Sequence, residues 1–160
     1  MHSFSQAALS ALFCADIKTA PGNNPGLIFA MYMTSGEPVD RNKDKWDELD
    51  VELLGKSPSS MWINYFHNGM AETAGTNKPF SPAFAANSGF HEYCLDWTAG
   101  GTAKWLVDGE QFHTMALTGW SKPMFPVASM WARNHPWSGQ ILRTETLYST
   151  MQNWRYIVRG

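Results

Sequence analysis

Residues 44–54 read DKWDELDVELL and combine a β-strand pattern with an unusual density of acids. Five of the fourteen acidic residues of the chain lie between Asp44 and Glu52. Glu48, Asp50 and Glu52 alternate with apolar residues, and side chains on a strand alternate between its two faces. The pattern therefore predicts a strand with apolar side chains in a core and three carboxylates together on the opposite face.

Three neighbouring carboxylates repel one another, so stability alone does not favour this row. An ordinary solvated strand face would interleave Lys, Arg, Ser or Thr with the acids. A calcium loop is a second alternative, because Asp40, Asn42 and Asp44 resemble its first ligands. However, its sixth position is Lys45 rather than Gly, and its twelfth is Val51 rather than Glu. We interpret the row as catalytic and expect that no cofactor is required. A structural calcium remains possible, but no pattern in the sequence identifies its ligands.

The composition of the 160 residues is that of a globular chain, with 44% hydrophobic and 16% charged residues. This length suits one hydrophobic core, so we predict a single domain over residues 1–160. The net charge of −2, without a basic stripe, argues against a nucleic-acid partner, and no apolar run is long enough for a membrane span. Eight Trp, nine Phe and five Tyr favour a cleft that stacks on sugar rings.

Strand and turn signals dominate the chain and predict an all-β, antiparallel sandwich or barrel. Gly, Pro and Asn turns separate short apolar or aromatic runs, and the Asp108-Gly109 pair is a strong hairpin signal. A helical turn is the alternative to strand for residues 6–13. The predicted strands are 27–33, 48–54, 61–66, 91–97, 102–107, 111–115, 124–131 and 153–158.

Two further features of the sequence allow two interpretations each. Cys14 and Cys94 are the only cysteines, and they could form one disulfide or remain two buried thiols. The first fifteen residues, MHSFSQAALSALFCA, contain a short apolar patch but no Lys or Arg before it. We therefore favour a structural segment over a secretory signal.

The chemistry that needs paired carboxylates is glycoside hydrolysis. A retaining glycosidase places two carboxyl groups roughly 5–5.5 Å apart, one as nucleophile and one as general acid/base. The Cα atoms of Glu48 and Glu52 would lie roughly 13 Å apart on an extended strand, so the sheet must curve to bring the side chains together. Asp50 between them would help to separate their pKa values.

The stretch WDELDVELLG closely resembles the active-site strand of glycoside hydrolase family 16, whose signature is Glu-x-Asp-x-Glu. Further segments resemble this family in the same order: LFCADIKTAPGNNPGLIFAMYM, INYFHNG, FHEYCLDW, KWLVDG and MWARNHPW. The resemblance implies a β-jelly-roll (concanavalin A-like) sandwich with an open cleft. It also implies that Glu48 is the nucleophile, Asp50 its helper and Glu52 the general acid/base. The single residue between Asp50 and Glu52 is typical of licheninases and xyloglucan-active members.

Six residues are predicted to bind the sugar. Alternation places Trp46 on the carboxylate face, and the next strand should present three side chains to the same face. Two tryptophans of MWARNHPW match family cleft aromatics, although plain core positions would also suit them. Near them, Ser129 and Ala132 stand where the family often has Asn. The predicted binding residues are Trp46, Trp62, Asn64, Phe66, Trp131 and Trp137, and no histidine spacing indicates a metal site.

Family members carry several N-terminal strands before the segment that resembles residues 5–33. Either the chain is a fragment or the fold has lost these strands, and both alternatives predict exposed sheet edges, self-association and marginal stability. We predict a retaining endo-β-glucanase, most like a licheninase, acting on mixed-linkage β-1,3-1,4-glucan. A xyloglucan or wall-glucan transglycosylase and a non-catalytic sugar-binding jelly roll are the alternatives. A polysaccharide substrate implies secretion, although the chain has no clear signal peptide.

Overall fold

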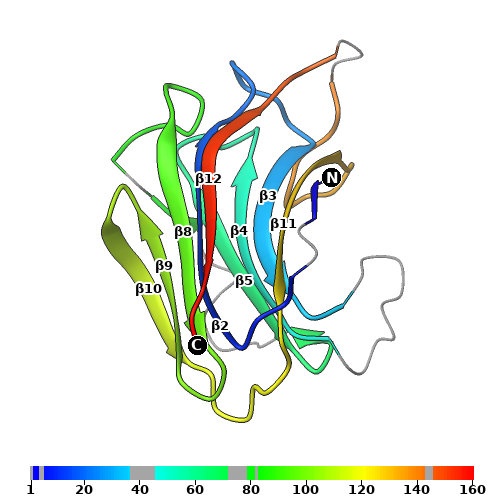
Figure 1. Cartoon of the computed structure of the whole chain (residues 1–160). Coiled ribbons are helices and arrows are strands. Elements are labelled where there is room, and N and C mark those ends of the chain that lie inside the picture. Colours follow the sequence, from blue (N-terminus) through cyan, green and yellow to red (C-terminus); the bar gives the residue numbers. More distant parts are fainter. Residues whose placement is uncertain (1, 4–5, 37–45, 72–78, 82, 143–145) are drawn as a thin grey trace.

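The computed structural model describes residues 2–3, 6–36, 46–71, 79–81, 83–142 and 146–160. These residues form two antiparallel sheets that lie face to face (Figure 1), which confirms the all-β prediction. Among them there is no helix, and thus none that is long and apolar enough to span a membrane. Asp40, Asn42 and Asp44, which were weighed as calcium ligands, lie outside the described residues.

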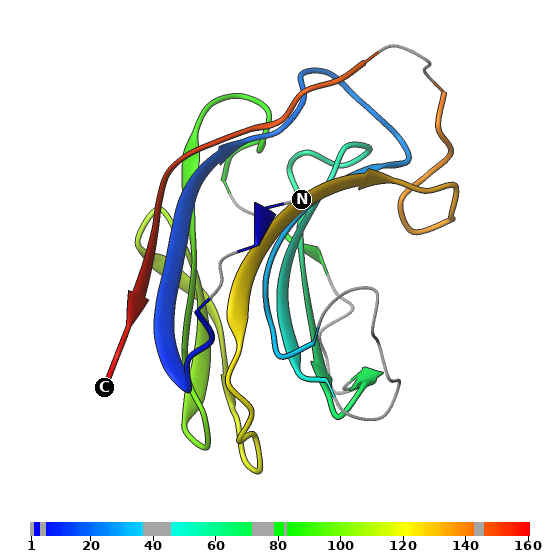
Figure 2. The same ribbon diagram turned by 45° about the vertical axis from the view of Figure 1, so that its right-hand side comes forward.

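The first sheet has seven strands and carries the acidic stretch near its centre. Its order is β1-β11-β3-β4-β5-β6, with β7 pairing the other end of β5. Figure 2 shows the long strands of both sheets bending along their length. The strands are β1 (His2–Ser3), β3 (Leu27–Thr34), β4 (Glu48–Leu54), β5 (Met61–His67), β6 (Met70–Ala71), β7 (Pro79–Phe80) and β11 (Phe125–Ala132).

The second sheet has five strands in the order β10-β9-β8-β2-β12. The helical alternative for residues 6–13 is wrong, because β2 begins at Ser10. Its alternate residues Ala11, Phe13 and Ala15 are fully buried, as the period of a strand requires. The strands are β2 (Ser10–Lys18), β8 (His91–Thr98), β9 (Thr102–Val107), β10 (Glu110–Ala116) and β12 (Thr150–Val158).

Two hairpin turns are positioned by residues with positive φ. Asp108 and Gly109 have φ of 50° and 81° and join β9 to β10, as their sequence predicts. Asn68 and Gly69, with φ of 51° and 78°, join β5 to β6 in the same way.

The hydrophobic core fills the space between the sheets. Strand β4 contributes Leu49, Val51 and Leu53, each at most 3% exposed. The facing sheet contributes large aromatic side chains, including Trp97 and Trp105, which are also buried. Because the apolar set of β4 points into this core, its acidic set must point away from it.

The outer face of the five-stranded sheet is crosslinked. Cys14 of β2 and Cys94 of β8 are direct cross-strand neighbours and form a disulfide, which decides between the two interpretations of these cysteines. Arg155 of β12 forms an ion pair with Glu92 at 2.6 Å. Since these strands come from the two ends of the described chain and its middle, the crosslinks hold together segments far apart in sequence.

Candidate active site

The register of the seven-stranded sheet assembles the site from three adjacent strands. On β4 and β5, Glu48 is opposite Phe66, Asp50 is opposite Asn64, and Glu52 is opposite Trp62. On the other side of β4, Tyr32 of β3 is opposite Asp50. Cross-strand partners point to the same face of a sheet, so the acids lie between a row from β3 and a row from β5.

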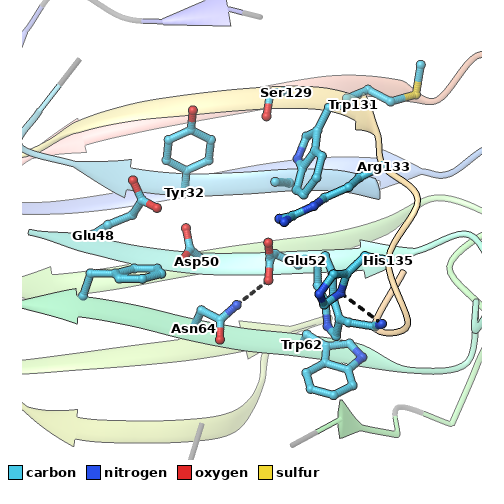
Figure 3. A pocket seen from close by; sticks show the side chains of 14 residues that line it. Tyr32, Glu48, Asp50, Glu52, Trp62, Asn64, Ser129, Trp131, Arg133 and His135 are labelled. Atoms are coloured by element: carbon cyan, nitrogen blue, oxygen red, sulfur yellow. Dashed lines mark hydrogen bonds between the residues drawn. The ribbon is translucent and has the colours of Figure 1, made fainter. Parts of the chain in front are cut away.

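The side chains on this face line a cleft of about 820 Å³. It contains the three predicted catalytic acids and five of the six predicted binding residues. Figure 3 shows the three acids side by side along β4, with Tyr32 on one side and Asn64 on the other. The lining residues are Ala30, Tyr32, Glu48, Asp50, Glu52, Trp62, Asn64, Phe66, Ser129, Met130, Trp131, Arg133, His135 and Trp137.

The carboxyl group of Glu52 is strongly perturbed by its surroundings. Burial removes water from its charged form and raises the pKa of Glu52 to about 7. Asn64 donates a hydrogen bond from Nδ2 to Oε2 of Glu52 at 2.5 Å and acts in the opposite direction, lowering the pKa. The negative charge of Glu48 raises it further. A carboxyl group with a pKa near neutrality can both donate and accept a proton at physiological pH.

Glu48 and Asp50 are more enclosed than Glu52. Only 6% of Glu48 and 5% of Asp50 is exposed. On the core side of the sheet, Trp105 of β9 donates a hydrogen bond from its indole Nε1 to the backbone carbonyl of Asp50 at 2.9 Å. The middle acid of the row is therefore tied through its backbone to the core of the facing sheet.

Three tryptophans gather at one end of the cleft. Trp62 and Trp137 make an edge-on contact with ring centroids 6.1 Å apart, and Trp131 stacks on Trp137 at 6.2 Å. Of the two positions weighed for Trp131 and Trp137, the structure has the cleft rather than the core. Aromatic faces with these spacings offer a platform for the apolar face of a sugar ring.

Trp46 is the one predicted binding residue that the structure does not place among those lining the cleft. It is 7% exposed and packs on Phe66, with ring centroids 4.6 Å apart. It precedes β4, which begins at Glu48, so the alternation of the strand does not extend to it. Trp46 thus contacts the cleft-lining residue Phe66.

A further buried acid, Asp47, lies immediately before β4 and anchors the start of the strand through its hydrogen bonds. Asp47 is buried, and its Oδ1 accepts hydrogen bonds from Lys122 Nζ at 3.0 Å, His67 Nδ1 at 3.1 Å and the backbone N–H of Asn68 at 2.9 Å. His67 in turn stacks on Trp120. These contacts fix the residue immediately before Glu48 and explain a histidine that the sequence leaves without a role.

Six lining residues were not predicted as site residues: Ala30, Tyr32, Ser129, Met130, Arg133 and His135. Three of these, Tyr32, Arg133 and His135, bear large polar side chains. Tyr32 lies within the continuous apolar run of β3, where no alternation separates the two faces. Arg133 follows Trp131 by two residues, and this spacing was a usable signal for a shared face. His135 lies in the loop beyond β11, where strand periodicity gives no information.

One further group of potential metal ligands lies outside the cleft. The ligand atoms of Cys14, Glu92 and Cys94 lie within 4.8 Å of one another. Both sulfur atoms are used in the disulfide, so this group does not fit a metal ion.

Residues 1–156 match the sequence model of the family described as glycosyl hydrolases family 16. A beta-glucanase of Paenibacillus macerans is 33% identical over 116 residues, which are 72% of this chain and 46% of that protein. A beta-glucanase of Bacillus subtilis is 34% identical over 100 residues, 62% of this chain and 38% of that protein. The chain thus spans about half the length of the relatives it matches, or less.

Solved structures share the fold. The Bacillus licheniformis beta-glucanase superposes with a TM-score of 0.78 at 25% identity, covering 98% of this chain and 69% of that one. An apo Crh5 transglycosylase superposes with a TM-score of 0.73 at 22% identity, covering 97% and 65%. These matches confirm the predicted jelly-roll sandwich.

Proposed function

Because this chain belongs to glycosyl hydrolases family 16, we propose that it hydrolyses a β-glucan with retention of anomeric configuration. The observation that carries the proposal is the row of Glu48, Asp50 and Glu52 in one cleft, with the pKa of Glu52 raised to about 7. One acid of the row can therefore hold a proton while a second acts as a nucleophile, which is the requirement of the double-displacement mechanism.

In the first step, the Glu48 carboxylate attacks the anomeric carbon while Glu52 gives its proton to the departing glycosidic oxygen. The bond between the sugar and the leaving group breaks, and a covalent glycosyl–Glu48 ester forms. In the second step, Glu52 takes a proton from a water molecule that attacks the same carbon and releases Glu48. Asp50, which lies between the two in the same cleft, is assigned the role of helper to the nucleophile.

Mixed-linkage β-1,3-1,4-glucan is the proposed substrate, cleaved internally along the chain. The likeness to beta-glucanases and the single residue between Asp50 and Glu52 support it. The tryptophan cluster of Trp62, Trp131 and Trp137 would stack on glucose rings, with Asn64 and Tyr32 offering polar groups nearby.

Transglycosylation of a wall glucan is the second candidate. The fold likeness to Crh5 transglycosylase favours it, as does a Crh-like protein of Arthroderma benhamiae that is 33% identical over 130 residues, 78% of this chain. Both reactions share the first step and differ in whether water or a sugar hydroxyl attacks the glycosyl–Glu48 ester. Chain-length analysis of products made with an added acceptor oligosaccharide distinguishes them.

The deciding experiment measures reducing-sugar release from barley β-glucan, laminarin and xyloglucan. We expect release from barley β-glucan, with the β-anomer formed first in a proton NMR time course. Glu48→Gln should abolish release, whereas Glu92→Gln, which changes a carboxylate on the outer face of the other sheet, should retain it. Full activity of Glu48→Gln would overturn the nucleophile assignment, and binding without release would favour a sugar-binding role.

Three further expectations accompany this function. The proposed reaction uses two carboxyl groups and water, so we expect EDTA to leave activity unchanged.

The Cys14–Cys94 disulfide is of the kind that persists in oxidising compartments, which supports secretion. β12 forms one edge of the five-stranded sheet and exposes Trp154 and Ile157, so self-association remains a prediction that sedimentation velocity can test.

A further inference from the structure

One wall of the cleft is the loop 133–140, and backbone hydrogen bonds fix its course. Arg133 N donates to Gly26 O at 2.8 Å, and His135 and Gly139 exchange hydrogen bonds of 3.1 and 2.7 Å. Ser138 Oγ donates to the Arg133 carbonyl at 2.8 Å. The side chains that leave this loop toward the cleft therefore start from a defined backbone.

Close packing holds the same loop against its neighbours. A Cβ added to Gly139, whose φ is +88°, would meet Pro25 Cβ at 2.8 Å. From the other side, Lys56 Nζ donates to the Pro136 carbonyl at 2.7 Å. These contacts hold the loop in a defined position as one wall of the cleft.

Arg133 is the cationic side chain of this wall. Figure 3 shows it pointing into the cleft between Trp131 and Glu52. The hydrogen bonds of Arg133 are made by its backbone, and its guanidinium has no protein partner among the residues that the structure describes. Five N–H donors are therefore available beside an aromatic platform.

His135 adds a second donor to the wall. The Trp137 N–H donates to His135 Nδ1 at 3.2 Å, so Nδ1 is an acceptor and the proton of the neutral imidazole is on Nε2. Nearby Ser129 and Met130 contribute only a hydroxyl and a thioether to the lining. The loop end of the cleft is therefore rich in donors and carries a positive charge, whereas the β4 row carries negative charge.

We propose that the Trp131–Arg133 end of the cleft is a subsite for a glucan residue that bears an anionic substituent, either a carboxylate or a sulfate ester. The inference deepens the proposed β-glucan hydrolysis and rests on it. A guanidinium matches the two oxygens of such a group with parallel N–H bonds, while the sugar ring stacks on the adjacent indole. The carboxylates of β4 repel an anion, so the substituent belongs on a ring next to the cleaved residue and not on that residue itself.

The test compares two polymers and three proteins. The polymers are barley β-glucan and the same glucan with part of its primary hydroxyls oxidised to carboxylates, matched in chain length. The proteins are the unchanged chain, Arg133→Gln, and Arg155→Gln as a control on the outer face of the other sheet. The measured quantity is the ratio of kcat/KM for the oxidised glucan to kcat/KM for the neutral glucan.

We expect Arg133→Gln to lower this ratio by roughly tenfold, because a charge-assisted hydrogen bond is lost on one polymer only. Arg155→Gln should leave the ratio unchanged, and about 0.5 M salt should reduce it for the unchanged chain by screening. A further variant, Arg133→Lys, extends the comparison and should give an intermediate ratio, since it keeps the charge but loses the bidentate geometry of the guanidinium.

Two results would overturn the proposal. Equal loss on both polymers would make Arg133 a donor to neutral sugar, and an unchanged ratio with an altered pH profile would make it only a counter-charge for the acids. If neither polymer is cleaved, affinity electrophoresis on both polymers still decides the inference. Stronger retardation by the oxidised glucan that is lost in Arg133→Gln would support the subsite while contradicting the proposed hydrolysis.

Discussion

The two sheets use acids on their outer faces in opposite ways. On the five-stranded sheet, Glu92 pairs with Arg155 and Asp96 pairs with Arg159, with N···O distances of 2.6 and 2.5 Å. On the seven-stranded sheet, Glu52 accepts a hydrogen bond from Asn64, a neutral amide, and lies near the charge of Glu48.

This difference indicates that the acids of the five-stranded sheet contribute to stability, whereas those of the seven-stranded sheet are arranged for proton transfer. An exposed carboxylate beside a guanidinium stays ionised and adds a little stability. A largely buried carboxyl group beside an amide and another acid keeps its proton to higher pH, which opposes its ionised form but prepares it for proton transfer. Substitutions of the same type should therefore have opposite consequences on the two faces, and the following experiments test this from the largest expected effect to the smallest.

Glu52→Gln should lower kcat on barley β-glucan by roughly 10²–10⁴-fold, because general acid/base catalysis is lost. In the unchanged chain, activity should fall as the pH rises through about 7, the pKa of Glu52. Asn64→Ala removes the bond that lowers this pKa, so the alkaline limb should move to higher pH. Asn153→Ala, which removes an amide contact to Asp16 on the other face, is the control and should leave the profile in place.

Loss of the disulfide should destabilise the fold by roughly 4 kcal/mol, because the bond closes a loop between residues 80 positions apart. Urea unfolding of the oxidised unchanged chain and of Cys14→Ser with Cys94→Ser measures this difference. The unchanged chain in reductant is a second sample without the bond and should match the variant. Below the unfolding transition, kcat should be nearly unchanged, since the bond lies on the face opposite the core. A large loss of kcat in the folded variant would show that the two outer faces are coupled.

Glu52→Gln should also stabilise the folded chain at pH 8. The folded pKa of about 7 exceeds the unfolded value of 4.5, so the folded state binds more protons between these values and stability falls as the pH rises. At about 1.4 kcal/mol for each pH unit, the substitution should gain up to about 3 kcal/mol at pH 8. At about pH 3 the gain should vanish, because the carboxyl group is then largely protonated in both states. Urea unfolding at the two pH values provides the measurement.

Arg155→Ala and Arg159→Ala should each cost about 0.2–1 kcal/mol, the usual range for exposed ion pairs. The effect should shrink in about 1 M salt, which screens exposed charges. A double-mutant cycle of Arg155→Ala with Glu92→Gln isolates the pair. Stabilisation by Glu92→Gln at pH 8 would contradict the comparison, because Glu92 would then behave like Glu52.

The centre of the fold was accessible from local pattern. The period-two alternation predicts a strand at 48–54, and β4 runs over Glu48–Leu54. That period also requires the acids and Leu49, Val51 and Leu53 to lie on opposite faces, as the structure has them. Such predictions succeed because alternation depends only on backbone geometry within one strand.

Features that depend on distant contacts could not be predicted in this way. The disulfide exists because β2 and β8 pair with Cys14 opposite Cys94, and no local pattern sets that register. His135 reaches the cleft through a loop whose course depends on close packing at Gly139, whereas the position of Arg133 two residues after Trp131 was a local signal. Trp46, a predicted binding residue, is not among the residues that line the cleft and packs on Phe66, a contact that no local pattern indicates.

The hydrogen bond from the Trp105 indole to the Asp50 carbonyl makes a core side chain a spectroscopic probe of the cleft. The indole lies on the side of the sheet that no sugar touches, yet its N–H senses any movement of the central acid's backbone. In a ¹H–¹⁵N spectrum its resonance should shift when an oligosaccharide binds. Occupancy of the cleft can thus be followed without a label on the ligand and without turnover.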